Sequence, residues 1–292
     1  MDDANRQSAG PVWVDGELIP PERAHAPLLT HSLQYGSGVF EGMRSYGGRI
    51  FENERHMARL INSAALLGYP LPHGVDELCA AAETLLAMAG GPDVYVRPFA
   101  WRGAEDIDIT GVRNRTHVGI ALWHLPDYYG TGLEIPSVTL ARGKWVRPDP
   151  DMVPLQSKAA GNYVAATLNR QYAKARGFSD CVVLDRHGHV VEATVANIFI
   201  VRDGRLITPP PVFCLNGITR QCVMELAHDL GIPCAEEEIG YPDLLAADEV
   251  FLTGTAVEVT PAVRVEDRRY DIGPVARSLW QAYGRRVGIA PR

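Results

Sequence analysis

The sequence lacks the long apolar runs and the leader patterns that direct a chain into or across a membrane. No apolar run in its 292 residues approaches the roughly 20 residues that a membrane span needs. The first ten residues, MDDANRQSAG, are polar and acidic, unlike a signal or transit peptide. The five cysteines form an odd count without a CxxC pair. We therefore expect reduced, structural thiols in a cytoplasmic protein rather than a disulfide or zinc framework.

Nucleotide-binding motifs and excess positive charge are also missing. Neither a GxGxxG sequence nor a P-loop is present. The net charge of -7 and the pI near 5.7 argue against nucleic acid or an anionic membrane as partner. Any bound anion must then be held by a local site. With 46% apolar and 22% charged residues, the composition is that of a soluble globular protein with one large domain or two ordinary ones.

Hydrophobic periodicity predicts a chain that mixes hairpins with helices. Hairpins with Asp-Gly and Gly-Gly turns are expected over 12–19 and 42–51. A helix is expected to begin near Asn53, as its cap, and to end at Gly68. Further helices are predicted over 76–89, 162–176, 219–230 and 274–286, and strand segments over 94–101, 117–123, 137–146, 181–209 and 248–253.

This order of elements predicts an α+β fold with mostly antiparallel sheets rather than a doubly wound nucleotide fold. The segment 125–136, LPDYYGTGLEIP, contains two prolines and two glycines and is expected to connect two domains. We therefore expect a small N-terminal domain over 1–124 and a larger domain over 137–292.

Lys158 has an unusual local setting in the stretch LQSKAAGNY (155–163). No Asp or Glu lies within four positions on its C-terminal side, so no helical neighbour there pairs with its ammonium group. Such a lysine is either a solvated loop residue or an amine that reacts with a carbonyl. From this stretch alone, the solvated interpretation is the commoner one.

Two glycine-containing turns offer hydrogen-bond donors to an anion. In NGITR (216–220), Gly217 allows a tight turn, and the N–H groups of Ile218 and Thr219 lie at the positive end of a helix dipole. That arrangement suits a phosphate, and a plain Thr N-cap is the alternative. In LTGTA (252–256), backbone donors and the Thr255 hydroxyl follow an apolar strand, where a simple strand-end turn is the alternative.

Two charged side chains stand in apolar surroundings. Glu192 interrupts the β segment 190–200 and either faces water at a sheet edge or keeps a ring nitrogen protonated. Arg59 lies on the helix of Met57 and Leu60, and it either binds an anion or extends along the surface.

In this order, seven motifs resemble the class IV (fold type IV) pyridoxal-phosphate aminotransferases, and most closely the branched-chain amino acid aminotransferases. The motifs are YGSGVFEGMR, HMARL, YVRP, SKAAGNY, VVEATVANIF, NGITR and FLTGTAVEVT, and they extend over nearly the whole chain. The resemblance implies a two-domain fold like that of D-amino acid aminotransferase, with an α/β N-terminal domain and an antiparallel, barrel-like core in the larger C-terminal domain. It also implies pyridoxal 5′-phosphate as cofactor, amino acid and 2-oxo acid substrates, and a cytoplasmic homodimer without a metal, nucleic acid or membrane partner.

The resemblance assigns roles to the matched positions. Lys158 would form the aldimine with the cofactor and then act as the base that moves the Cα proton. Glu192 would pair with the pyridine nitrogen and Tyr163 with the ring hydroxyl. The phosphate contacts would come from Arg59, Ile218, Thr219 and Thr255, and other cofactor contacts from Asn197, Gly217 and Gly254. Substrate contacts would come from Tyr95, Thr255 and Ala256 at the α-carboxylate, Arg97 and Tyr35 at a second carboxylate, Phe40 and Tyr128 at the side chain, and Arg44.

The implied reaction is a ping-pong exchange of an amino group between branched-chain or similar apolar L-amino acids and 2-oxoglutarate. The loop 102–115 departs from the family pattern, because Glu105, Asp106 and Asp108 occur where a glycine-rich sequence is expected. In the family this loop reaches a partner subunit's pocket, so acids there would weaken dicarboxylate binding or suit a basic or amine substrate. Leu125 stands where an aromatic residue is usual, and Ala196 where some relatives have an acid.

Other functions on the same scaffold stay open. They are a D-amino acid or (R)-amine transaminase, an aminodeoxychorismate lyase, and a non-catalytic binding protein. The triplet YVR (95–97) with FEGMR upstream favours the branched-chain type. His187 and His189 have metal-like spacing, but they lie in a predicted β-turn without a companion set of ligands, so we expect no metal site.

Overall fold

The computed structural model of this protein describes residues 8–90, 93–124 and 135–289. The chain divides into two compact units, of which the first comprises Met1–Pro126 with Ser157–Gly161 and the second Asp127–Gln156 with Asn162–Arg292. The segment that contains Lys158 thus belongs to the N-terminal unit, although it is distant in sequence. The domains 1–124 and 137–292 stay a prediction, and the compact units differ from them at this segment.

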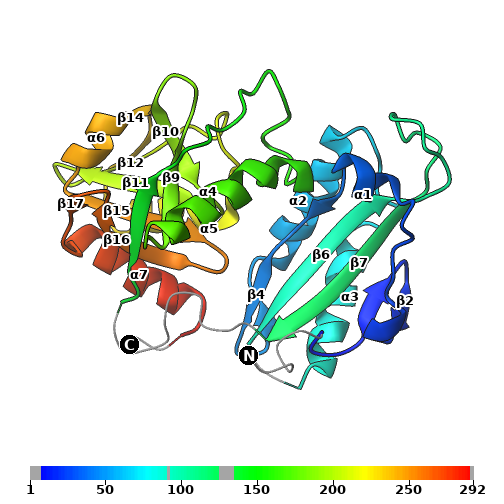
Figure 1. The fold of residues 1–292 in the computed structure, drawn as a ribbon. Helices are drawn as coiled ribbons and strands as arrows, with labels where there is room; N and C mark the ends of the chain where they lie inside the picture. The colour runs from blue at the N-terminus through cyan, green and yellow to red at the C-terminus, as the bar shows by residue number, and fades with distance from the viewer. Residues whose placement is uncertain (1–7, 91–92, 125–134, 290–292) are drawn as a thin grey trace. The chain divides into compact units, whose positions relative to one another are not determined.

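The first unit is built on a seven-stranded antiparallel sheet with the order β2-β1-β7-β6-β4-β5, in which β3 also pairs with β6. The long strands β6 and β7 pair along their whole length and run through its middle (Figure 1). The strands are β1 (Val12–Val14), β2 (Glu17–Ile19), β3 (Val39–Phe40), β4 (Met43–Tyr46), β5 (Arg49–Ile50), β6 (Val94–Arg102) and β7 (Thr116–His124). The helices are η2 (Pro21–Arg23, a 3₁₀ helix), α1 (His31–Tyr35), α2 (Asn53–Leu66) and α3 (Val75–Met88).

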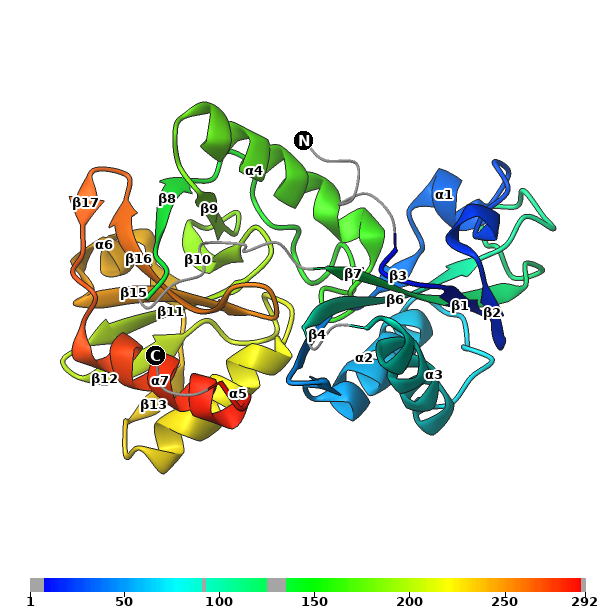
Figure 2. The same cartoon turned by 90° about the horizontal axis from the view of Figure 1, so that it is seen from below.

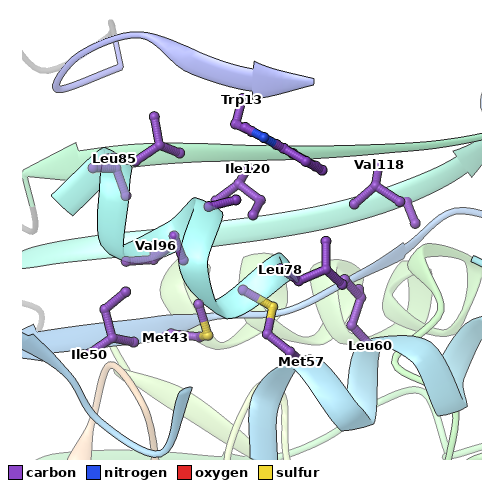
Figure 3. Close-up of a cluster of buried hydrophobic side chains, with 14 of the residues drawn as sticks. Trp13, Met43, Ile50, Met57, Leu60, Leu78, Leu85, Val96, Val118 and Ile120 are labelled. Carbon is purple, nitrogen blue, oxygen red and sulfur yellow. The ribbon is translucent and has the colours of Figure 1, made fainter. Parts of the chain in front are cut away.

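Helices α2 and α3 lie side by side and cover one face of this sheet (Figure 2). Buried and half-buried residues alternate along β6, because successive side chains of a strand point to opposite faces. Figure 3 shows the resulting core, in which Met57 and Leu60 from α2 pack in one cluster with Val96 from β6. Each large apolar side chain buried in this way stabilises the fold by about 1.5–3 kcal/mol.

The second unit contains a ten-stranded sheet whose order runs β13-β12-β11-β15-β16-β8-β9-β10-β14, with β17 paired to β16. Most pairings are antiparallel, whereas β12–β13, β8–β16 and β8–β9 are parallel. The strands are β8 (Val138–Arg142), β9 (Asp180–Leu184), β10 (His189–Ala193), β11 (Asn197–Arg202), β12 (Arg205–Thr208), β13 (Cys234–Glu236), β14 (Ile239–Gly240), β15 (Glu249–Gly254), β16 (Glu258–Val265) and β17 (Arg268–Arg269). The helices are η3 (Ala160–Tyr163, which starts in the first unit), α4 (Val164–Ala175), α5 (Ile218–Asp229), α6 (Tyr241–Ala246) and α7 (Pro274–Arg286), and α5 and α7 pack against β15 and β16.

The predicted fold class is confirmed, and so are both hairpins, whose turn residues Asp15, Gly16, Gly47 and Gly48 have positive φ. The core of the second unit is a mixed sheet rather than an antiparallel one, because β8 and β13 each join it with parallel pairings. The capping role predicted for Asn53 is wrong. Its side chain Nδ2 instead donates to the carbonyl of Cys79 at 3.4 Å, on the neighbouring helix α3.

All five cysteines are free, and Cys181, Cys214 and Cys222 are buried, which agrees with the predicted structural thiols. Burial raises the pKa of the Cys214 thiol to about 12, so this group stays protonated. Among the helices of the described residues, none has both the length and the apolar character required to cross a membrane.

Candidate active site

Lys158 is held in the first unit by its backbone. Its N–H donates to Ser63 Oγ at 3.0 Å, and its carbonyl accepts from the N–H of Phe40 at 3.1 Å. The next residue, Ala159, bridges to Val39, so this segment runs beside β3. The Lys158 side chain is half-buried, and its Nζ lies 5.0 Å from the centroid of the Phe40 ring. This lysine is therefore not a fully solvated loop residue.

Arg59 contacts a buried acid on the same unit. The carboxylate of Glu41 is fully buried, and it accepts hydrogen bonds from Arg59 Nε at 2.6 Å and Arg59 Nη2 at 2.9 Å. His56 Nδ1 lies 2.8 Å from the same carboxylate. The interpretation of Arg59 as a residue that merely extends along the surface is therefore wrong, because a two-point ion pair fixes its guanidinium.

The Phe40 ring contacts two cationic side chains of the first unit, Arg97 and Lys158. The guanidinium carbon of Arg97 lies 4.7 Å from the Phe40 ring centroid, and Arg97 Nη2 donates to the Tyr95 hydroxyl at 2.9 Å. Gly42 permits this arrangement, because a Cβ at that position would overlap the Tyr95 hydroxyl. The cationic groups of Lys158 and Arg97 thus contact one aromatic ring, which attracts cations electrostatically.

The other predicted substrate residues of the first unit are placed by different contacts. The Tyr35 hydroxyl, on α1, donates to the carbonyl of Ile107 at 3.4 Å. Arg44, on β4, has its guanidinium carbon 4.9 Å from the centroid of the Tyr46 ring. Tyr128 and Leu125 lie outside the described residues.

In the second unit, Glu192 is a buried residue of β10 rather than an exposed edge residue. Its Oε1 lies 3.0 Å from Nε of Arg147, which is buried as well. A buried carboxylate requires a counter-charge, and Arg147 supplies it. Of the two interpretations of Glu192, the one that places it at a water-facing sheet edge is wrong, and its predicted role toward a ring nitrogen stays a prediction.

The N-terminus of α5 has the backbone geometry that the NGITR motif predicts. Gly217 is the N-cap, and no side chain caps the helix. The plain Thr N-cap interpretation is wrong, because Thr219 is the second helical residue and is buried. A Cβ on Gly217 would overlap Asn197 Oδ1, and Asn197 Nδ2 donates to the carbonyl of Leu215 at 2.9 Å. Asn197 thus orients the turn before Ile218.

The remaining predicted residues of the second unit lie in turns or at a helix end. Thr255 and Ala256 are half-buried in the turn between β15 and β16, directly after Gly254. Tyr163 is half-buried and is the N-cap residue of α4.

The carboxylates of the loop 102–115 bind the loop itself. Asp106 accepts from the N–H of Asp108 and from Arg113 Nε, and these hydrogen bonds lower the pKa of its carboxyl. Asp108 accepts from Thr110, which likewise lowers the pKa of Asp108. Glu105 accepts from a backbone N–H at the end of the loop. All three acids thus contribute to the loop's own conformation.

Three residues of this arrangement were not assigned a role from the sequence: Glu41, His56 and Arg147. Glu41 carried a usable signal, because it is an acid in the stretch VFEGM (39–43), whose other residues are uncharged. Arg147 carried none, because its partner lies far along the chain and no local spacing relates the two.

Comparison with known proteins extends the resemblance beyond the motifs. A family model described as "Amino-transferase class IV" matches residues 38–265. A protein of Rickettsia felis named "Probable branched-chain-amino-acid aminotransferase" is 38% identical over 281 residues, which cover 94% of this chain and 95% of that protein.

Solved structures show the same similarity in three dimensions. The branched-chain aminotransferase of Thermoproteus uzoniensis, solved with norvaline, has a TM-score of 0.91 and 37% identity, and the match covers 95% of this chain and 94% of that one. The branched-chain amino acid aminotransferase of Thermobaculum terrenum, solved in its PLP form, has a TM-score of 0.88 and 29% identity, with coverage of 98% and 96%. The fold of this chain is therefore the fold of these aminotransferase structures, and the family predicted from the motifs is the family to which the neighbours belong.

Proposed function

The chain belongs to the class IV aminotransferases, and we propose that it is of the branched-chain type. It moves an amino group between branched-chain or similar apolar L-amino acids and 2-oxoglutarate by a ping-pong route. One observation carries this proposal: relatives with that name match nearly the whole chain. The matched length includes the Lys158 segment and the group of Phe40, Tyr95, Arg97 and Lys158, which we call the Phe40 cluster.

Pyridoxal 5′-phosphate is the cofactor that the residues fit. The chain offers an amine at Lys158, a fixed guanidinium at Arg59 and a buried carboxylate at Glu192, which are chemically complementary to an aldehyde, a phosphate and a protonated ring nitrogen. When bound, the cofactor supplies an aldehyde carbon that takes up an amino group and a ring that disperses the charge left at the substrate Cα.

Each residue then has a defined task. Lys158 would hold the cofactor through its amine, and the same amine, when neutral, would act as the base for the substrate Cα proton. Glu192, balanced by Arg147, would accept a hydrogen bond from the protonated ring nitrogen. Tyr163 would bind the ring hydroxyl. Arg59, Ile218, Thr219 and Thr255 would supply the phosphate contacts, with Gly217, Gly254 and Asn197 as further cofactor-binding residues.

The Phe40 cluster accounts for the use of both apolar and acidic substrates. Tyr95 accepts a hydrogen bond from Arg97, and its hydroxyl group donates a hydrogen bond to the α-carboxylate of the substrate. Arg97 packs on the Phe40 ring when the side chain is apolar and presents its charge when a second carboxylate arrives. The carboxylates of the loop 102–115 accept hydrogen bonds within the loop. This favours an apolar substrate over a basic or amine substrate, because these acids already have partners.

We also propose a homodimer. The first unit exposes apolar side chains on the loop 102–115 and on the segment 28–33, and we call this group the α1 patch. The two segments are connected by the Ile109 carbonyl, which accepts a hydrogen bond from His31 of α1. The α1 patch consists of Leu28, Leu29, Leu33, Ile107, Ile109 and Val112, each more than 60% exposed. Large exposed apolar patches mark protein–protein contacts. The cytoplasmic location expected from the free cysteines stays a prediction.

The decisive experiment follows the half-reactions of the protein loaded with pyridoxal 5′-phosphate. We expect rapid spectral conversion with L-leucine and L-glutamate but not with D-alanine or (R)-1-phenylethylamine, and parallel double-reciprocal plots with 2-oxoglutarate as acceptor. Lys158→Ala should lower turnover by at least about 10²-fold, since general acid–base catalysis contributes that much or more. Full turnover by this variant would overturn the mechanism, and preference for D-alanine or the amine would overturn the substrate assignment.

A further inference from the structure

One face of α2 carries three residues that bind Glu41 and the segment of Lys158. His56, Arg59 and Ser63 follow one another at spacings of three and four, which place them on the same side of a helix. Ser63 Oγ accepts from the N–H of Lys158 at 3.0 Å, and the Ser63 carbonyl accepts from Ser157 Oγ at 2.9 Å. The helix that carries Arg59 thus also holds the backbone of the lysine.

Phe40 and Glu41, at the end of β3, also bind both Lys158 and Arg59. The N–H of Phe40 donates to the carbonyl of Lys158 at 3.1 Å. The next residue, Glu41, is fixed by its backbone N–H, which donates to the Pro98 carbonyl of β6 at 2.8 Å, and its side chain binds Arg59. Two adjacent residues therefore connect the lysine backbone and the arginine guanidinium to the central strand of the sheet.

The ion pair between Glu41 and Arg59 also sets the direction of the guanidinium. Glu41 Oε1 binds Arg59 Nε, and Oε2 binds Nη2, so both contacts use one edge of the planar group. His56 Nδ1 holds Oε2 from a further side at 2.8 Å. The guanidinium has five N–H donors in a fixed geometry, and the edge formed by Nη1 and the second N–H of Nη2 is turned away from Glu41.

We propose that Glu41 is a positioning residue, which holds the outer edge of Arg59 at a fixed place relative to Lys158, so that one ligand with an aldehyde and a phosphate engages both. This inference rests on the proposed function, because it takes Arg59 as a phosphate ligand and Lys158 as the residue that binds the aldehyde carbon. Glu41 touches neither substrate nor cofactor and acts through Arg59.

A plain charge-balancing role for Glu41 makes a different prediction. If the carboxylate only neutralised Arg59, Glu41→Gln, which removes the charge, would strengthen the attraction between Arg59 and a phosphate. Glu41→Asp, which moves the charge slightly, would then change phosphate binding little. If the carboxylate positions Arg59, both changes weaken phosphate binding, because the two-point contact needs the side-chain length and both oxygens of glutamate.

The test compares two ligands that differ only in the phosphate: pyridoxal 5′-phosphate and pyridoxal. Dissociation constants of both are measured by absorbance titration of the cofactor-free protein for wild type, Glu41→Gln and Glu41→Asp, after circular dichroism has shown native folding. We expect the preference for the phosphorylated ligand to fall about tenfold or more in both variants, with pyridoxal binding little changed. If Glu41→Gln does not fold, Glu41→Asp, which keeps the charge beside His56 and Arg59, provides the same test.

Glu52→Gln is the matched control. Glu52 precedes the same helix and pairs with Arg55 at 3.5 Å, so its loss removes an acid–arginine contact away from Glu41. The preference for pyridoxal 5′-phosphate over pyridoxal should be unchanged in Glu52→Gln. An unchanged or increased preference in the Glu41 variants would overturn the positioning role. Wild-type protein that binds neither ligand would instead overturn the proposed function.

Discussion

Two titratable side chains in the first unit owe their ionisation state to burial and to each other. Burial would raise the pKa of the Glu41 carboxyl, but the charge of Arg59 and the hydrogen bonds from Arg59 and His56 outweigh it, so this pKa lies well below its usual range. Burial lowers the pKa of His56, against the opposing effect of Glu41. A neutral His56 with its proton on Nδ1 is the tautomer that donates to the carboxylate.

Both groups make the folded protein more sensitive to acid. Each binds protons less readily when folded than when unfolded, so stability rises with pH in their titration ranges. The contribution of His56 is present above its ordinary pKa of about 6.5 and is lost as pH falls through the lower folded pKa. The contribution of Glu41 to stability is present above the ordinary glutamate pKa of 4.5. It is lost as pH falls toward the pKa of Glu41 in the folded protein, which lies well below 4.5.

The variant His56→Asn tests the first of these ranges. Asparagine keeps a donor near the position of Nδ1 but does not titrate, so the loss of stability as pH falls below about 6.5 should become shallower by up to ~1.4 kcal/mol per pH unit. Urea denaturation at a series of pH values measures this slope. His228→Asn, at an exposed residue, is the control. Parallel curves for wild type and His56→Asn would contradict the assignment.

At the scale of elements, the start of α5 depends on the close packing of two residues, Asn197 and Gly217. Asn197 reaches from β11 to the turn before the helix, and Gly217 leaves room for its Oδ1. The residue types alone indicated the helix start. The approach of a strand residue to the turn was visible only in the packed structure.

The pair predicts coupled effects of two substitutions. Gly217→Ala should cost about 1–3 kcal/mol through overpacking against Asn197, and Asn197→Ala a similar amount by leaving the Leu215 carbonyl without this donor. The double variant should lose less than the sum, because the clash disappears with the asparagine. Urea unfolding measures all three. Gly74→Ala, where a Cβ would meet no atom within 4 Å, is the control, and strictly additive losses would disprove the coupling.

For the whole molecule, the α1 patch leads to a test of assembly. Wild type should sediment with twice the mass of the chain, and the double variant Leu33→Asp with Ile109→Asp should sediment as a monomer, because charges do not pack against an apolar interface. Met152→Asp, at an exposed apolar residue of the second unit, should not change the mass. A wild-type monomer at micromolar concentration would refute the proposed dimer.

Much of the architecture was predictable from local patterns. The final helix has its predicted bounds, and the other four predicted helices begin or end within about two residues of the observed ones. The short helix α1, helix α6 and strand β16 were not predicted. The first two are too short to show a helical period.

The sequence by itself determined the order of helices and strands and the seven motifs, because both depend on residue type and spacing within a few positions. Only the tertiary structure decided that the Lys158 segment joins the first unit, that Glu41 holds Arg59, and that Arg147 faces Glu192. These partners lie far apart along the chain. They meet only when sheets and helices pack, and burial then requires each charge to be paired.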